Sequence, residues 1–211
     1  MDLTLYVDSH WISPYAMSAF VALEEKGLAY EVREVSLPKG EQHTYGARTG
    51  RVPALRHGEY WLAESLAIAE YLAETFPYPH AAPTMLFPPD LKERGICREV
   101  MSWIRSDLSP IREERPTHTI FYERATAPLS PAGERAASRL IAACDRLIEE
   151  GRTTLFGAWC IADPDLALMI QRLHLNGHPL PAKMVAYAEA NWQHPAVQKW
   201  CAHPRPPYVP Y

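Results

Sequence analysis

The hydrophobic pattern of this chain changes period once, at a proline-rich stretch that follows residue 76. Before it, apolar residues alternate with polar ones in four short runs typical of strands, and they recur at helical spacing in two longer runs. From residue 91 onward, only helical spacing occurs. We therefore predict an α/β domain over residues 1–80, a proline-rich linker over 81–90 and an all-helical domain over 91–211.

The elements of the first domain follow the order β-α-β-loop-β-β-α. The first two strands are predicted to be parallel, because the helix between them forms a right-handed crossover. The last two form a hairpin around His57-Gly58. This order is that of a thioredoxin-like half. We predict strands over residues 3–7, 30–35, 51–55 and 59–62, and helices over 14–26 and 65–76.

The second domain shows no strand pattern and ends in a tail that carries four prolines. We predict its helices over residues 91–108, 131–150, 163–176, 181–192 and 195–202.

Composition excludes several classes of protein. The 211 residues are 47% hydrophobic and 22% charged, which is ordinary for a globular protein. A net charge of −4 does not fit a nucleic-acid binder, and no run of about 18 apolar residues exists that would span a membrane. The chain opens on an alternating strand rather than on a signal peptide, so we expect a cytoplasmic protein.

Four cysteines are widely separated along the chain and form no CxxC pair. We interpret them as reduced thiols that pack in the interior, and we expect no metal site. They are Cys97, Cys144, Cys160 and Cys201.

The junction between the first strand and the first helix carries the strongest functional signal. Ser13 is a good N-cap and Pro14 a good first helical residue. A helix N-terminus stabilises an anion, because it presents free N–H groups and about half a positive charge. The serine hydroxyl would point at the same place.

Ser13-Pro14-Tyr15-Ala16 occupies the position where a glutaredoxin carries Cys-Pro-Tyr-Cys, with both cysteines absent. Such a turn cannot exchange disulfides by itself, but it can hold the thiol of another molecule. It resembles the serine-type active-site turn of the glutathione transferase superfamily. The resemblance implies that Ser13 donates a hydrogen bond to the glutathione thiolate, with Tyr6 as the alternative because other transferase classes use a tyrosine near the end of this strand.

Two further motifs occur at the spacing of that superfamily. Val52-Pro53 resembles the cis-proline turn, where the residue before the proline pairs with the cysteinyl backbone of glutathione. Glu64-Ser65 resembles the pair that holds the γ-glutamyl end, the acid meeting its ammonium and the serine its carboxylate. Each also has a structural reading, as a strand start and as a helix cap.

Lys39 and Gln42 resemble the residues that hold the glycyl carboxylate, although a solvated loop lysine is the simpler reading of Lys39. The segment Cys160-Ile161-Ala162-Asp163 resembles a helix-start box in which Asp163 is structural.

The amino-acid sequences of residues 105–116 and 154–163 resemble those of bacterial transferases of the YfcF type. Within the first of these segments, Arg105 and Arg112 are candidates for binding an anionic substrate or a second glutathione carboxylate. The alternative is a solvated charged surface.

The resemblance covers nearly the whole chain and implies a glutathione transferase fold. It implies glutathione as co-substrate, conjugation to a small-molecule electrophile or reduction of an organic hydroperoxide, and a homodimer, with roles in detoxification and oxidative stress. Two alternatives stay open, a glutathione-binding or ligand-binding protein without turnover and a glutathione-dependent disulfide-bond reductase. We expect no nucleic-acid or membrane partner.

Overall fold

The computed structural model describes residues 2–76 and 85–210 and divides into two compact units. Unit 1 comprises Met1–Leu86 with Pro195–Tyr211, and unit 2 comprises Phe87–His194. This division differs from the predicted one at the C-terminal end, because the last helix and the tail belong to unit 1. Part of the predicted linker, residues 81–84, lies outside the described residues.

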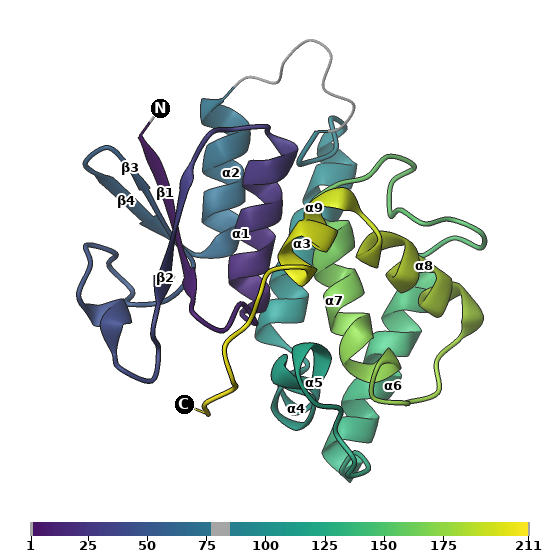
Figure 1. Cartoon of the computed structure of the whole chain (residues 1–211). Helices are drawn as coiled ribbons and strands as arrows, with labels where there is room; N and C mark the ends of the chain where they lie inside the picture. The colour runs from purple at the N-terminus through teal and green to yellow at the C-terminus, as the bar shows by residue number, and fades with distance from the viewer. Residues whose placement is uncertain (1, 77–84, 211) are drawn as a thin grey trace. The chain divides into compact units, whose positions relative to one another are not determined.

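Unit 1 is built on a four-stranded mixed sheet with the order β2-β1-β3-β4 (Figure 1). Its strands are β1 (Leu3–Asp8), β2 (Glu31–Val35), β3 (Ala54–His57) and β4 (Tyr60–Ala63). As predicted, β2 is parallel to β1, and β3 and β4 form an antiparallel hairpin. The third strand begins three residues later than predicted, because Pro53 has no N–H to donate to the ladder.

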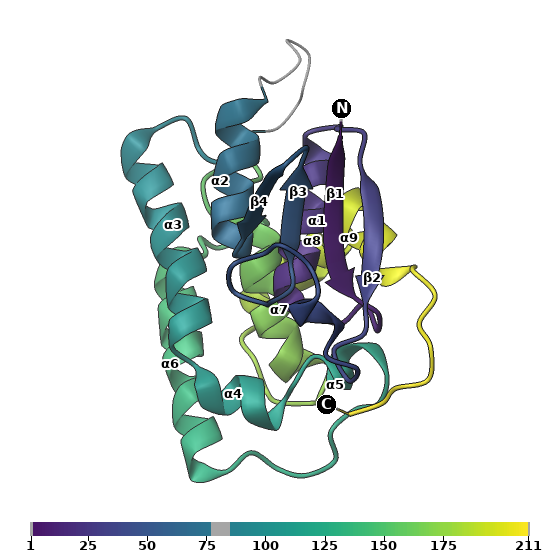
Figure 2. The same ribbon diagram turned by 90° about the vertical axis from the view of Figure 1, so that its left-hand side faces the viewer.

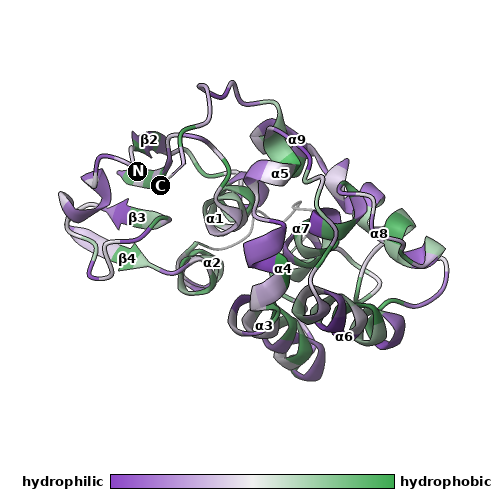
Figure 3. Ribbon diagram, turned by 90° about the horizontal axis from the view of Figure 1, so that it is seen from below, coloured by the Kyte–Doolittle hydropathy of each residue, from purple (hydrophilic) through white to green (hydrophobic). Residues whose placement is uncertain are grey.

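In the described part of unit 1, the α-helices lie on one face of this sheet. Helix α1 (Pro14–Glu25) and helix α2 (Ser65–Thr75) pack against each other and against the strands, and α9 (Pro195–Cys201) packs on α1. Strand alternation turns Leu5, Val7 and Leu55 toward α1 and α2, and all three are buried. Figure 3 shows the two helices side by side on one side of the strands.

The opposite face of the sheet is covered by a loop. The connection from β2 to β3 contains only a single short 3-10 helix, η1 (Glu41–His43), as the lack of any period over residues 37–50 predicts. Figure 2 looks onto this face and shows the loop in front of the lower end of the sheet. Tyr6, Val35 and Ala54 form a small buried cluster beneath it.

Unit 2 is helical, and its central helix is almost entirely buried. Helix α7 packs against α3, α4, α5 and α8, because nearly every one of its residues is turned inward. The short helices α4 and α5 were not predicted. The helices are α3 (Leu91–Ser106), α4 (Ser109–Glu114), α5 (His118–Phe121), α6 (Pro131–Leu147), α7 (Ala162–His174) and α8 (Ala182–Trp192).

Asp163 has the structural role predicted for it at the start of α7. Its carboxylate accepts hydrogen bonds from the backbone N–H groups of Leu155 and Cys160, both at 2.8 Å, and from the Tyr187 hydroxyl at 2.7 Å. None of the four cysteines forms a disulfide, and Cys97, Cys144 and Cys160 are buried. Among the described residues, no helix combines the length and the hydrophobicity needed to cross a bilayer.

Candidate functional site

Three of the motifs singled out in the sequence meet at one edge of the unit 1 sheet. Tyr6 near the end of β1 pairs with Ala54 at the start of β3, and Ala54 pairs with Ala63 at the end of β4. Because both pairings are antiparallel, the segments carrying Ser13, Val52-Pro53 and Glu64-Ser65 leave the sheet at the same edge. Strands β1 and β4 are about 10 Å apart, because β3 lies between them and each strand spacing is about 5 Å.

Ser13 is the N-cap of α1, as predicted. Its Oγ accepts a hydrogen bond from the N–H of Ala16 at 3.2 Å, and Pro14 is the first helical residue. Within the described part of the chain the hydroxyl hydrogen of Ser13 has no acceptor. Ser13 is only 9% exposed, so a group that receives this hydrogen would sit in a partly desolvated place next to a helix N-terminus.

Asp8, which the sequence did not single out, holds the turn before Ser13 in place. Its two carboxylate oxygens accept hydrogen bonds from the N–H groups of Ile12 and Ser13, both at 2.9 Å. Burial raises the pKa of the Asp8 carboxyl, while these amide hydrogen bonds act in the opposite direction. The sequence signal that could have indicated this role is an aspartate at the end of a strand, a few residues before a Ser-Pro helix start.

The Val52-Pro53 peptide bond is cis, as the resemblance implies. Val52 lies outside β3, and within the described residues neither its backbone N–H nor its C=O forms a hydrogen bond. Such a residue can pair with an extended peptide, because the two groups of one residue match those of an added strand.

Glu64 immediately precedes α2 and has an unusual backbone conformation, with φ +70° and ψ +117°. A non-glycine residue in this region costs about 1 to 3 kcal/mol, and such strain is concentrated at functional sites. The Glu64 side chain is exposed and does not cap the helix. Ser65 is the first residue of α2 and is 3% exposed. Here the carboxylate is free to meet a cation while the helix N-terminus favours an anion.

The two residues predicted to hold a carboxylate lie on the loop between β2 and β3. Lys39 is exposed, whereas Gln42 is partly buried with its Nε2 3.3 Å from Nε2 of His43. The Oε1 atom of Gln42 is buried without a hydrogen-bond partner among the described residues. These observations do not test the predicted role of Lys39 and Gln42 in binding the glycyl carboxylate, which stays a prediction.

Tyr6 occupies different surroundings from Ser13. It is 8% exposed and packs against Tyr45 and Trp61, with ring centroids 4.8 and 5.1 Å apart. Its side chain lies on the sheet face opposite α1 and α2. Its alternative role as thiolate partner remains a prediction, and its packing is that of a residue in an aromatic cluster.

Arg105 and Arg112 make contacts inside unit 2. Arg105 forms an ion pair with Asp165 at 2.5 Å, linking α3 to α7. Arg112 donates hydrogen bonds to the carbonyl oxygens of Ile104 and Asp107, where α3 ends. These contacts favour structural roles over the solvated surface considered from the sequence. Substrate binding by the two arginines stays a prediction.

The arrangement at the sheet edge suits a particular kind of ligand. Two helix N-termini favour anionic groups, the carboxylate of Glu64 favours a cation, and the backbone of Val52 offers a peptide-like pairing. Together these features match an extended, peptide-like zwitterion with at least two anionic groups.

Comparisons with known proteins match both halves of the chain to one family. Residues 12–75 match the family model "Glutathione S-transferase, N-terminal domain", and residues 90–204 match "Glutathione S-transferase, C-terminal domain". The chain is 43% identical to a solved glutathione transferase homologue from Burkholderia gl BGR1 with bound glutathione. That similarity covers 95% of this chain and 96% of that chain, with a TM-score of 0.77.

Similar curated proteins include transferases and isomerases. Glutathione S-transferase Z1 of Arabidopsis thaliana is 32% identical over 204 residues, which is 90% of this chain and 87% of the relative. Probable maleylacetoacetate isomerase 2 of Drosophila melanogaster is 28% identical over 195 residues, covering 85% of this chain and 80% of the relative. The predicted YfcF subgroup stays a prediction.

Proposed function

Because the chain belongs to the glutathione S-transferase family, we propose that it binds glutathione at the sheet edge of unit 1 and uses the glutathione thiolate as a nucleophile. The observation that carries the proposal is the Ser13 hydroxyl, which caps α1 and has no acceptor for its hydrogen among the described residues. The glutathione-bound relative at 43% identity supports the choice of ligand.

Each part of glutathione has a partner in this proposal. Glu64 receives the γ-glutamyl ammonium, and Ser65 with the N-terminus of α2 receives the γ-glutamyl carboxylate. The backbone of Val52 pairs with the cysteinyl residue, and Lys39 with Gln42 receives the glycyl carboxylate. Ser13 then donates its hydrogen bond to the cysteinyl sulfur and lowers the pKa of the thiol.

The proposed reaction is conjugation to a small electrophile. The thiol loses its proton, the sulfur forms a bond to the electrophilic carbon, and the leaving group departs with the bonding electrons. Reduction of an organic hydroperoxide follows from the same thiolate, which attacks the outer oxygen and releases the alcohol. A second glutathione then converts the resulting sulfenic acid to glutathione disulfide and water.

Isomerisation is a second candidate, favoured by the relatives named as maleylacetoacetate isomerases. A maleyl group has a cis double bond conjugated to a carbonyl. Addition of the thiolate turns this bond into a single bond, rotation follows, and elimination of the thiolate gives the trans isomer. Glutathione is therefore regenerated rather than consumed.

Counting glutathione against product separates these functions. Calorimetry first establishes glutathione binding, and turnover is then measured with 1-chloro-2,4-dinitrobenzene, cumene hydroperoxide, 2-hydroxyethyl disulfide and maleylacetone. We expect one glutathione consumed per aryl conjugate and two per hydroperoxide, and none consumed in isomerisation. Binding without any turnover would favour the non-catalytic alternative, and turnover only with the disulfide would favour the reductase. Absence of glutathione binding would overturn the proposal.

A further inference from the structure

A hollow of about 490 Å³ lies on the sheet face that α1 and α2 leave uncovered. We call it the sheet-face hollow. None of Ser13, Val52, Glu64 or Ser65 lines it, so it is distinct from the proposed glutathione site. It is lined by Tyr6, Arg33, Glu34, Val35, Glu41, Thr44, Tyr45, Gly46 and Trp61.

Three aromatic rings form one wall of the sheet-face hollow. Tyr45 and Trp61 are stacked with ring centroids 5.6 Å apart and planes 11° from parallel, and Tyr6 is tilted against both. Tyr45 and Trp61 are only partly buried, so each keeps part of its ring surface open. A flat aromatic molecule gains most from such a wall, because offset-stacked and edge-to-face ring pairs are favourable.

Small residues lie beneath and beside this wall. Ala54 is buried in the cluster on which Tyr45 and Trp61 pack, and it stands beside Tyr6 in the same cross-strand row. Gly46 approaches the indole of Trp61 so closely that an added Cβ would lie 2.7 Å from its Nε1. A side chain at position 46 would therefore displace the indole of Trp61 from the wall.

Three charged side chains line the sheet-face hollow, namely Arg33, Glu34 and Glu41. Glu34 accepts a hydrogen bond from Trp11 Nε1, and Glu41 accepts one from the N–H of Ser36, both at 2.8 Å. Arg33, by contrast, forms no hydrogen bond or ion pair with any described residue, although Glu31 lies two positions away on the same face of β2. Both carboxylates keep their negative charge, because their donors are neutral. Arg33 is therefore the lining side chain whose charged group has no partner among the described residues and is available to a ligand.

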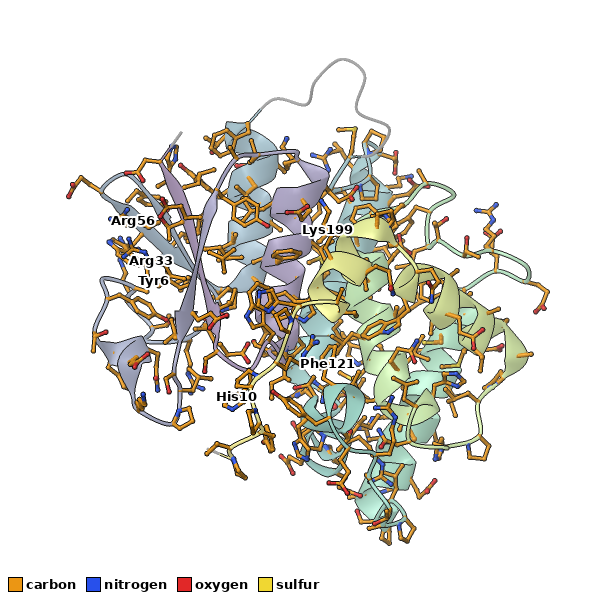
Figure 4. All side chains as sticks on the ribbon, in the orientation of Figure 1. Tyr6, His10, Arg33, Arg56, Phe121 and Lys199 are labelled. Atoms are coloured by element: carbon orange, nitrogen blue, oxygen red, sulfur yellow. The ribbon has the colours of Figure 1, made fainter. Side chains whose placement is uncertain are left out.

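A second arginine stands on the same face. Arg56 lies directly opposite Trp61 in the hairpin, and Figure 4 shows Arg33, Arg56 and Tyr6 together on the side of the sheet away from the helices. The Nε of Arg56 and the Oγ1 of its cross-strand neighbour Thr4 are buried without hydrogen-bond partners among the described residues. Its one ion pair, with Asp2, is long at 3.5 Å and exposed. Buried polar groups are normally paired, so these two atoms mark an incomplete polar environment.

We propose that the sheet-face hollow binds a flat aromatic molecule carrying one anionic group, such as an arene carboxylate, sulfonate or phosphate ester. The rings stack on the wall of Tyr45 and Trp61. The anionic group pairs with the guanidinium of Arg33. Aromatic stacking alone does not select a charge, whereas the guanidinium of Arg33 has donors free to form a bidentate pair with an anionic group.

The test uses 8-anilinonaphthalene-1-sulfonate as probe and N-phenyl-1-naphthylamine as its uncharged analogue. Binding of each is followed by fluorescence, with S-hexylglutathione present at saturation to occupy the proposed glutathione site. We expect the sulfonate to bind, and Arg33→Gln to weaken its affinity about tenfold or more while changing that of the uncharged analogue little. Trp61→Leu should weaken both probes.

Arg135→Gln is the matched control, because Arg135 is an exposed arginine of unit 2 that does not line the sheet-face hollow. It should bind both probes as the wild type does. Equal sulfonate affinity in wild type and Arg33→Gln would overturn the proposal, as would complete displacement of the sulfonate by S-hexylglutathione. The comparison of Arg33→Gln with Arg135→Gln needs no glutathione, so it stands even where the proposed function fails.

Discussion

Arg205 donates two hydrogen bonds to the carbonyl oxygen of Trp11, from Nε at 3.2 Å and from Nη2 at 3.1 Å. The same guanidinium binds the carbonyl oxygens of Cys201 and His203 at 2.8 and 3.0 Å. Trp11 is buried, has a positive φ of 53° and stacks on the His203 ring at 3.5 Å. The C-terminal tail thus holds the turn that ends two residues later at Ser13.

We predict that Arg205→Ala shifts the pH profile of turnover toward higher pH. Without Arg205 the buried carbonyl of Trp11 loses two donors, which costs about 1 to 2 kcal/mol of stability and loosens the Ser13 turn. The apparent pKa from kcat/KM against pH should rise in Arg205→Ala. In Arg205→Lys it should return part of the way to the wild-type value. Arg124→Ala is the control, because Arg124 likewise binds two backbone carbonyls, those of Thr119 and Ile120 in unit 2. A rise of equal size in the control would contradict the prediction.

Ser13→Ala should lose most activity at neutral pH and recover part of it above about pH 9. A free thiol with a pKa of about 8.5 is about 7% ionised at pH 7.4. Lowering that pKa by about two units requires about 2.7 kcal/mol, which one hydrogen bond to a charged group and the helix N-terminus together supply. Turnover of an aromatic electrophile against pH is the measurement. If Tyr6→Phe loses activity while Ser13→Ala keeps it, the role passes to Tyr6.

Glu64→Ala should weaken glutathione binding by about 2 to 3 kcal/mol, or roughly thirty- to a hundred-and-fifty-fold. The reason is that the γ-glutamyl ammonium loses its carboxylate partner. Glu64→Gly should weaken binding as much, yet be more stable than Glu64→Ala by about 1 kcal/mol, because glycine adopts a φ of +70° without strain. Calorimetry gives the affinities and urea unfolding the stabilities. An unchanged dissociation constant in both variants would remove Glu64 from the site.

The protein's own thiols should be nearly inert. Burial raises the pKa of the Cys201 thiol to about 11, with the charge of Arg205 acting in the opposite direction. At pH 8 about 24% of a free thiol is ionised, against about 0.1% at a pKa of 11, so labelling should be slower by about a hundredfold or more. The labelling rate with a chromogenic disulfide, compared with free cysteine, checks this. Rapid labelling of one thiol in the folded protein would contradict it.

The chain should form a homodimer. In unit 2, an apolar hollow of about 420 Å³ between α3 and α6 is lined by Val100, Trp103 and Leu147 among others. On α3, Leu91 is 77% exposed and Ile96 is 40% exposed. A partner subunit on this surface would remove its apolar residues from water, and two-fold dimers are the commonest closed oligomers. Sedimentation should give about twice the chain mass of 23.9 kDa, and a monomer at micromolar concentration would contradict this.

The sequence by itself determined the strands and the longer helices, together with their order. Helix starts such as Ser13-Pro14 and periods of two or 3.6 residues are local properties, readable from neighbouring residues. The N-cap role of Ser13 was predicted for the same reason and is confirmed. The cis bond at Val52-Pro53, which the resemblance to the transferase superfamily implied, is also confirmed. The packing of the terminal helix α9 on α1 could not be predicted in this way, because where a terminal helix packs is not a local property.

Only the tertiary structure decided which residues meet. Antiparallel register brings Ser13, Val52 and Glu64 to one edge of the sheet, and burial makes Asp8 the acceptor that holds the Ser13 turn. The contact between Arg205 and Trp11 joins residues 194 positions apart. Such contacts depend on the shapes and burial of whole elements once they are packed. Local sequence propensity therefore does not predict these long-range contacts.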